Sequence, residues 1–276
     1  MKIRVVIPAR YASKRLPGKP LLLIAGKTML QRVVSLSRAA IAGLAHDALV
    51  VVATDDERIK QHAKDMDVPV IMTSIEARTG TDRVAEAVAF MADEPDFVIN
   101  MQGDAPFTPP EVIRAMIDAF VAMQSDVVTP VTQLSWSQLD KFRQQKLTTP
   151  FSGTTALFDE VSGRAFWFSK TILPALRHER ELRGLSDKSP VFRHIGLYGY
   201  SLAALNRFVQ LPESQFEALE GLEQLRLLEH GLSIRCVPLP YGAQMMMSGV
   251  DSPEDLLRAN RMIEQHGDDF LQGVPL

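Results

Sequence analysis

The sequence predicts an α/β protein whose first half is a doubly wound, mostly parallel sheet. Residues 3–7 form a short run rich in β-branched side chains, typical of a central strand buried on both faces, and Pro8 is expected to end it. Apolar runs then alternate with helical stretches as far as residue 123, which is the pattern of successive βαβ units. From residue 126 the pieces become shorter and more β-like, so we expect a smaller β-rich lobe inserted into the fold.

The expected elements follow the chain in order. In the first half, strands are expected at residues 3–7, 48–53, 68–72 and 96–101, and helices at residues 29–42, 57–65, 82–91 and 109–123. In the second half, β-like pieces are expected at residues 126–132, 154–160, 163–169 and 232–239, and helices at residues 203–208, 218–230 and 253–266. A charged stretch at residues 177–188 is expected to be an exposed loop.

Two of the later helices carry end signals. Gly231 is a stop for the helix at residues 218–230, and Ser252 with Asp255 forms a capping box at the start of the last helix. The sequence shows no repeats and no low-complexity linkers. We therefore interpret residues 1–276 as one domain, with an inserted lobe at about residues 126–200.

Composition limits the class of protein and its partners. The net charge of −3, from 30 basic and 33 acidic residues, argues against nucleic acid or an anionic membrane surface as the main partner. No stretch reaches the roughly 18 apolar residues of a membrane span, and the apolar N-terminal run is too short for a signal peptide. The single cysteine, Cys236, excludes an intrachain disulfide and is expected to be packed in the core. We expect a cytoplasmic enzyme.

The loop after the first strand is the clearest candidate site. It brings Arg10, Arg15 and Lys19 into one short turn at the carboxyl end of a core strand, where open α/β sheets bind ligands. These cations and the backbone amides suit the triphosphate of a nucleotide, and the alternative is a solvated basic turn. The Gly26-Lys27-Thr28 segment is not a P-loop, because Leu21 stands where that motif needs glycine.

Two aspartates are candidates for magnesium, which nucleotide phosphate chemistry usually requires. Asp104 follows the predicted strand at residues 96–101, and Asp251 precedes the last helix, where the capping box leaves it free. Elsewhere, Gly80 offers a turn that can approach a base or sugar, with Arg83 facing an acidic group, although simple helix capping by Thr81 explains the same residues. Single residues of this kind are weak evidence for function.

Several weaker candidates have bland alternatives. If the segment around His194 is extended, His194 and Tyr198 share one face, but a packed core histidine is the more common case. Glu223 and Gln224 lie on a predicted helix, where such polar residues ordinarily face solvent.

Together these segments resemble the CMP-Kdo synthetases, the cytidylyltransferases that activate 3-deoxy-manno-octulosonate (Kdo). The similarity runs in family order through IPARYASKRLPGKPL, VATDDERI, TGTDR, INMQGDAPF, FRHIGLYGY, LEQLRLLEHG and GVDSPEDL. The resemblance implies a Rossmann-like nucleotidyltransferase fold, usually dimeric through the smaller lobe. It also implies that CTP and Kdo react with magnesium to give CMP-Kdo and pyrophosphate, for lipopolysaccharide or capsule synthesis.

The resemblance also assigns roles by position. It implies a nucleotide site at Arg10, Ser13, Arg15, Lys19, Gly80 and Thr81. It also implies a magnesium site at Asp104 and Asp251. Of these, Asp104, Lys19 and Arg10 are the expected catalytic residues. The pocket for the sugar acid is implied at Arg83, Gln102, Lys170, His194, Tyr198, Glu223 and Gln224.

The chain departs from the family pattern beside the metal, at the acceptor site and, mildly, at the start of the segment around Gly80. Ala105 replaces the usual glutamate of QGDEP, Lys170 replaces the arginine of FSR, and Thr79 begins the usual SGTDR. Lysine cannot present the bidentate fork of arginine to a carboxylate. The alternatives are therefore a cytidylyltransferase for a different 2-keto-3-deoxy sugar acid, or a nucleotide-binding paralogue without catalysis.

Overall fold

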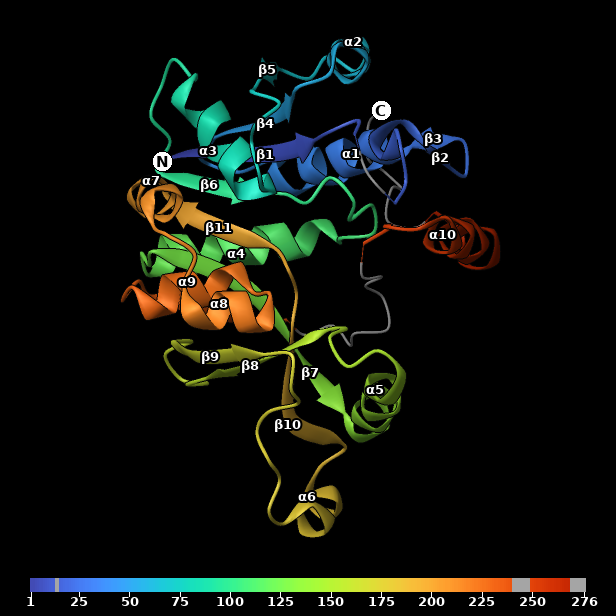
Figure 1. Cartoon of the computed structure of the whole chain (residues 1–276), viewed down its shortest axis with the longest axis vertical. Helices are drawn as coiled ribbons and strands as arrows, with labels where there is room; N and C mark the ends of the chain where they lie inside the picture. The colour runs from blue at the N-terminus through green and yellow to red at the C-terminus, as the bar shows by residue number, and fades with distance from the viewer. Residues whose placement is uncertain (13–14, 240–248, 269–276) are drawn as a thin grey trace. The chain divides into compact units, whose positions relative to one another are not determined.

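The computed structural model describes residues 1–12, 15–239 and 249–268 (Figure 1). The chain divides into two compact units, Met1–Arg114 with Met246–Leu276, and Ala115–Met245. The lobe proposed at residues 126–200 lies within the second unit. None of the described helices is long and apolar enough to cross a membrane.

The first unit is built on a parallel sheet, which confirms the predicted α/β class. The strand order is β5-β4-β1-β6, and β1 is central because it pairs with β4 on one side and β6 on the other. Five consecutive residues of β1, from Ile3 to Ile7, are buried. The strands are β1 (Lys2–Ala9), β4 (Asp47–Thr54), β5 (Val70–Met72) and β6 (Phe97–Asn100).

Pro8 does not end the first strand, contrary to the prediction. β1 continues through Pro8 to Ala9, where both residues remain in register with β4. The pairing with β6 stops at Val6, so Pro8 lies where β1 has a partner on one side only. A residue without an N–H is tolerated in that position.

The helices of the first unit agree closely with the predicted ones. They are α1 (Met29–Ile41), α2 (Glu57–Asp65), α3 (Gly80–Ala89), α4 (Pro110–Ala122), which runs into the second unit, and α10 (Pro253–His266). A short helix, η1 (Lys19–Leu21), and a hairpin of β2 (Leu23–Ile24) and β3 (Lys27–Thr28) were not predicted. Thr28 caps α1 by accepting from the backbone N–H of Gln31, which gives the GKT segment a structural role.

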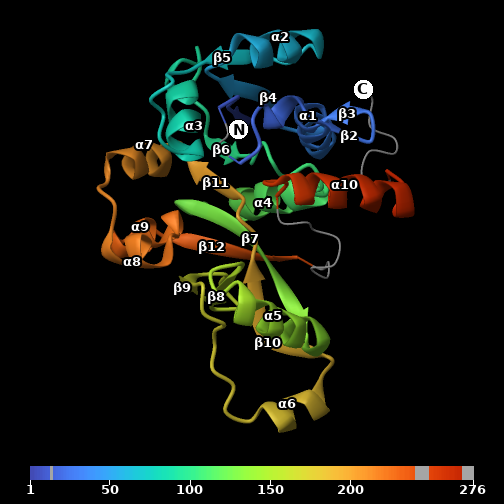
Figure 2. The ribbon, with the colours of Figure 1, turned by 45° about the vertical axis from the view of Figure 1, so that its right-hand side comes forward.

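The second unit is organised around β7, which runs parallel to β12 and antiparallel to β10 and β11 (Figure 2). Cys236 of β12 is buried, as predicted. The strands are β7 (Val127–Ser135), β8 (Thr154–Phe158), β9 (Ala165–Ser169), β10 (Lys188–His194), β11 (Tyr198–Ser201) and β12 (Ile234–Leu239). The helices are α5 (Trp136–Thr148), α6 (Glu179–Leu185), α7 (Leu202–Gln210), α8 (Gln215–Glu220) and α9 (Glu223–Glu229).

The charged stretch at residues 177–188 is not simply a loop, because it contains α6. Glu179 of α6 accepts hydrogen bonds from Arg143 of α5 and from Arg183, and Arg183 also reaches Asp140 of α5. These hydrogen bonds lower the pKa of Glu179 to about 2. Charge pairing with a neighbouring helix, which a local sequence pattern does not reveal, orders this segment.

The prediction of one helix at residues 218–230 is also wrong, because this part of the chain forms two helices, α8 and α9. The chain turns at Gly221, whose φ of 64° lies in the left-handed region that favours glycine. Arg226 of α9 donates to the buried carboxylate of Glu217 in α8, which fixes the turn between the two helices. Gly231 follows the end of α9, as predicted.

His194 is a buried polar side chain of the second unit, 7% exposed. Its Nε2 lies 2.8 Å from the hydroxyl of Thr129, and its ring meets that of Phe168 edge to face. Burial, helped by the nearby charge of Lys170, lowers the pKa of His194 to about 3. The folded chain therefore keeps this imidazole neutral at physiological pH.

We expect acidification from pH 7 to pH 5 to destabilise the chain through His194. The unfolded imidazole takes up a proton below its ordinary pKa of 6.5, whereas the folded one does so only near pH 3. Stability is therefore present above pH 6.5 and is lost as the pH falls, by about 2 kcal/mol at pH 5. Urea denaturation of wild type and H194Q at both pH values measures this loss.

H178Q, which replaces an exposed histidine, is the matched control. H194Q should lose less stability on acidification than wild type or H178Q. Equal losses in all three proteins would show that His194 is not held neutral.

Candidate functional site

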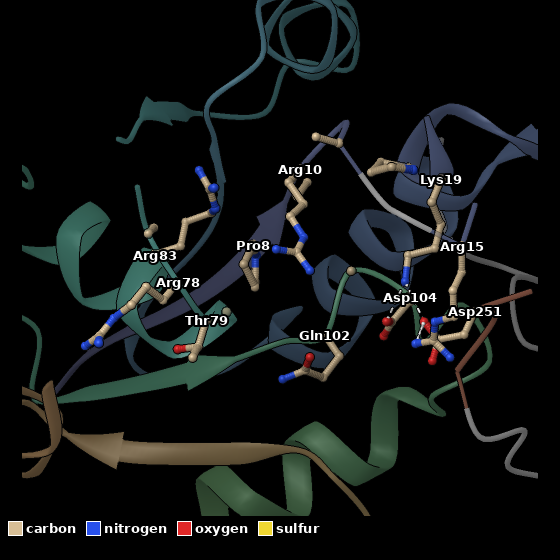
Figure 3. A pocket seen from close by; sticks show the side chains of 16 residues that line it. Pro8, Arg10, Arg15, Lys19, Arg78, Thr79, Arg83, Gln102, Asp104 and Asp251 are labelled. Atoms are coloured by element: carbon tan, nitrogen blue, oxygen red, sulfur yellow. Dashed lines mark hydrogen bonds and ion pairs between the residues drawn. The ribbon is translucent and has the colours of Figure 1, made fainter. Parts of the chain in front are cut away.

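The first unit contains a cavity of about 730 Å³ at the carboxyl ends of β1 and β6 (Figure 3). This is the edge at which open α/β sheets bind ligands. The cavity is lined by Pro8, Ala9, Arg10, Ala12, Arg15, Lys19, Pro20, Ala77, Arg78, Thr79, Gly80, Arg83, Gln102, Gly103, Asp104 and Asp251. Eight of these residues were predicted as site residues from the sequence.

A close approach of two loops shapes the floor of this cavity. A Cβ at Gly103 would lie 2.6 Å from the carbonyl oxygen of Pro8, so only glycine fits there. The loop after β6 therefore lies directly against the end of β1, which places Gln102 and Asp104 beside Arg10.

The C-terminal segment supplies the second carboxylate. The backbone N–H of Val250 donates to the carbonyl oxygen of Asp104 at 2.8 Å, which places Asp251 beside Asp104. The predicted capping box of Ser252 and Asp255 is confirmed at the start of α10. Helix α10 packs in an apolar cluster formed by Leu16, Ile24, Met29, Phe107, Val250, Ala259 and Ile263.

As predicted, the capping box does not use the Asp251 carboxylate, but this carboxylate is paired with two cations. Its Oδ1 lies 2.9 Å from Nζ of Lys19 and 3.2 Å from Nη2 of Arg15. The same Lys19 ammonium lies 2.7 Å from Oδ2 of Asp104. Burial alone disfavours the ammonium, but the two carboxylates outweigh it, so the pKa of Lys19 is raised.

Described residues of the loop between Arg10 and Lys19 make two contacts, one within the loop and one with Arg58 of α2. The N–H of Gly18 donates to the carbonyl of Tyr11, and Gly18 adopts a φ of 67°. The guanidinium of Arg58 stacks on the Tyr11 ring at 3.3 Å from its centroid. Ser13, predicted to bind the nucleotide, lies outside the described residues.

The segment at residues 79–83 divides between cavity and core. Thr79, not Thr81, caps α3, in a capping box with Asp82, and Gly80 lines the cavity. Thr81 is buried and accepts from Nδ2 of Asn100, and it does not line the cavity. Arg83 reaches the wall, but it is 3% exposed and its guanidinium pairs with Asp55 at 2.8 Å.

Some cavity residues were not predicted from the sequence. Arg78 and Thr79 precede the predicted Gly80, and Figure 3 shows them on the same wall as Arg83. Their position next to a glycine turn was the available signal. Pro8 and Gly103 also line the cavity, and neither carries a polar side chain that would mark it in the sequence.

Two of the residues predicted for the sugar-acid pocket, Arg83 and Gln102, line the cavity of the first unit, and the other five belong to the second unit. The Tyr198 hydroxyl donates to Oε1 of Gln224 at 2.8 Å, and the rings of His194 and Tyr198 are 5.5 Å apart. Burial, with smaller contributions that include the charge of Glu223, raises the pKa of Tyr198. Lys170 lies near enough to His194 to lower its pKa, and burial lowers the pKa of Lys170 itself.

His194 and Tyr198 do not share one extended strand. His194 of β10 pairs with Val131 and Gly199 of β11 pairs with Val128, so five positions along the chain from β10 to β11 match three along β7. This irregularity brings the two rings together.

Gln224 is buried, contrary to the expectation that it faces solvent. It is 2% exposed, and its Nε2 has no hydrogen-bond partner among the described residues. A buried amide group without a partner is costly unless a ligand or water satisfies it.

The described residues contain no cluster of three or more His, Cys, Asp or Glu side chains that could hold a metal by themselves. Asp104 and Asp251 each place one carboxylate oxygen within 2.9 Å of Nζ of Lys19, so two candidate oxygen ligands lie around one point. Magnesium is commonly bound by one or two carboxylates, with substrate phosphates and water completing the octahedron. The residues present therefore fit a magnesium ion that takes its other ligands from a bound phosphate and water.

Known proteins match this chain over nearly its full length. The profile of the family described as cytidylyltransferase matches residues 4–234. A 3-deoxy-manno-octulosonate cytidylyltransferase of Maricaulis maris is 40% identical over 97% of this chain and 99% of its own length. The protein of that name from Vibrio cholerae is 36% identical over 96% of this chain and 99% of its own length.

A solved structure agrees with these matches. It is that of CMP:2-keto-3-deoxy-manno-octonic acid synthetase complexed with CTP, at 32% identity and a TM-score of 0.81, and the match covers 96% of this chain and 99% of the other. The length and identity of these matches show that the chain belongs to the cytidylyltransferase family.

Proposed function

We propose that this chain is a 3-deoxy-manno-octulosonate cytidylyltransferase, which makes CMP-Kdo and pyrophosphate from CTP and Kdo. The observation that carries the proposal is the cavity in which Lys19, Arg10 and Arg15 lie beside Asp104 and Asp251. The names of the relatives in Maricaulis and Vibrio, and the CTP in the related structure, support this substrate pair.

The cations of the cavity would hold the triphosphate. Arg10 has no ion pair among the described residues, and Arg15 is exposed apart from its contact with Asp251. Guanidinium groups bind phosphate oxygens through paired, charge-assisted hydrogen bonds. Gly80, at the start of α3, would let the backbone approach the nucleoside.

Magnesium is proposed as the cofactor, with Asp104 and Asp251 as its protein ligands. When bound, it would neutralise charge on the phosphates during transfer. The absence of the usual glutamate at Ala105 leaves the site with these two carboxylates, consistent with an ion that takes its other ligands from substrate and water.

The reaction that this arrangement suits is an in-line displacement at phosphorus. The anomeric hydroxyl oxygen of the sugar acid forms a bond to the α-phosphorus and releases its proton to solvent, as the bond from that phosphorus to the oxygen bridging the α- and β-phosphates breaks. Lys19, Arg10 and Arg15 would stabilise the charge that gathers on the leaving pyrophosphate. The site needs no covalent enzyme intermediate.

The cluster in the second unit would bind the sugar acid. The Nε2 group of Gln224 can donate to an oxygen of this substrate, and Tyr198 fixes the amide by bonding its Oε1. Lys170 offers one ammonium, and the backbone N–H of Lys170 donates to Oε2 of Glu220. The homodimer and the cytoplasmic location remain predictions from the sequence and the resemblance.

We expect pyrophosphate release from CTP, and not from UTP, ATP or GTP, when Kdo and magnesium are present. A coupled assay with each nucleotide measures this. Release only with another 2-keto-3-deoxy sugar acid would identify a different acceptor. This is the second candidate function, because Lys170 stands where the family usually has arginine. CTP binding without release with any acid would contradict catalysis.

Asp104→Asn should lower kcat at least about 100-fold while leaving the fold intact, because it removes a charge that holds the metal without changing side-chain size. Steady-state kinetics and circular dichroism measure the two effects. Asp65→Asn, on the exposed part of α2, is the matched control. Normal turnover in D104N would contradict the assignment of Asp104 as a metal ligand.

Lys170→Arg should raise kcat/KM for Kdo by about threefold to tenfold, because arginine presents a fork to a carboxylate that lysine cannot. The same substitution at Lys188, an exposed residue at the start of β10, is the control. An unchanged kcat/KM in K170R would show that Lys170 does not limit recognition of the acceptor.

A further inference from the structure

Lys19 occupies the point at which the two metal-binding candidates converge. Its Nζ lies 2.7 Å from Oδ2 of Asp104 and 2.9 Å from Oδ1 of Asp251, and its side chain is only 15% exposed. Figure 3 shows the dashed contacts from Lys19 and Arg15 meeting at this pair of carboxylates. In this arrangement, the two negative charges are matched by two positive ones, on Lys19 and Arg15.

A divalent ion on the same oxygens would meet this ammonium at short range. Magnesium binds oxygen at about 2.0–2.1 Å, so it would lie within about 5 Å of Nζ of Lys19. Two positive charges that close in a partly buried site repel each other strongly. The ion therefore needs Lys19 to leave the carboxylates.

A triphosphate provides the means of moving Lys19. Arg10 also lines the cavity, and it has no ion pair in the described part of the chain, so its charge is available to a phosphate. The backbone of Lys19 is fixed, because it begins η1 after the left-handed Gly18 and before the buried Pro20. Only the flexible side chain of Lys19 has to turn from carboxylate to phosphate.

We propose that Lys19 is an internal counter-cation that keeps the metal site closed until a nucleotide binds. The proposal rests on the proposed function, in that Asp104 and Asp251 are taken as the metal ligands. The phosphates attract the ammonium away from the carboxylates and supply the remaining ligands of the incoming ion. Metal and nucleotide therefore bind together, and the chain alone binds divalent cations weakly.

Metal binding in the absence of any nucleotide tests this proposal. Mn²⁺ is the probe, and the signal of free Mn²⁺ in electron paramagnetic resonance reports how much is bound. We expect K19M to bind Mn²⁺ at least about tenfold more tightly than wild type, because the competing charge is gone. The double variant K19M/D104N should lose this gain.

Arg10→Met is the matched control, since it removes a cation that lines the same cavity without breaking an ion pair to either carboxylate in the described structure. R10M should change the affinity for Mn²⁺ by less than about threefold. A gain in R10M equal to that in K19M would overturn the proposal, because it would reflect the general charge of the cavity.

Equal Mn²⁺ affinity in wild type and K19M would also overturn the proposal, as would binding by wild type that is as tight without CTP as with it. K19Q replaces K19M if circular dichroism shows that the methionine variant is unfolded. These titrations need no turnover. A failure to release pyrophosphate therefore counts against the proposed function, and unchanged metal binding in K19M counts against this inference.

Discussion

The close approach of Gly103 to the carbonyl of Pro8 is the constraint on which the cavity depends. It forces the loop after β6 against the end of β1, so that the arginine following one strand and the aspartate following the other face the same space. Gly249 repeats the arrangement on the other side of Asp104, where a Cβ would lie 3.0 Å from the Asp104 carbonyl oxygen. Two glycines thus allow three backbone segments to meet around one carboxylate.

This crowding explains why charge, not apolar packing, organises the site. Lys19, Arg15, Asp104 and Asp251 each have a partner of opposite sign at this junction, as Lys19 has with Asp104 and Asp251. Behind the junction, Arg83 and Asp55 form a further pair, buried in the wall. The cavity keeps exposed cations at Arg10 and Arg78, where an anionic ligand would enter.

Much of the fold follows from local sequence. The bounds of α2 and α10 match the prediction because Asp56 and Ser252 cap them through their own side chains. The segment of α6 was expected to be a loop because its order comes from ion pairs with α5, which no local pattern records. The parallel strands of the first unit were predicted because burial on both faces favours a run rich in β-branched apolar residues, as in β1.

The site was harder to predict than the fold. The residue types around the cavity were identified from the basic loop and from the resemblance, but their pairing was not, because Lys19 and Asp251 are 232 positions apart. Burial of Gln224 was missed for the same reason: contact with Tyr198, 26 positions away, overrides the ordinary exposure of a polar helix residue. Sequence indicates which groups are available, and tertiary contact decides how each is used.

The late position of α10 has a consequence for synthesis on the ribosome. Ile24 and Met29 belong to an apolar cluster that Ala259 and Ile263 of α10 help to form, so this cluster stays incomplete until α10 has emerged from the ribosome. Domains generally fold as units during synthesis, and exposed apolar surface makes a partly folded chain prone to aggregation. The cation-lined half of the cavity and Asp251 are therefore joined only after the segment that carries α10 has been synthesised.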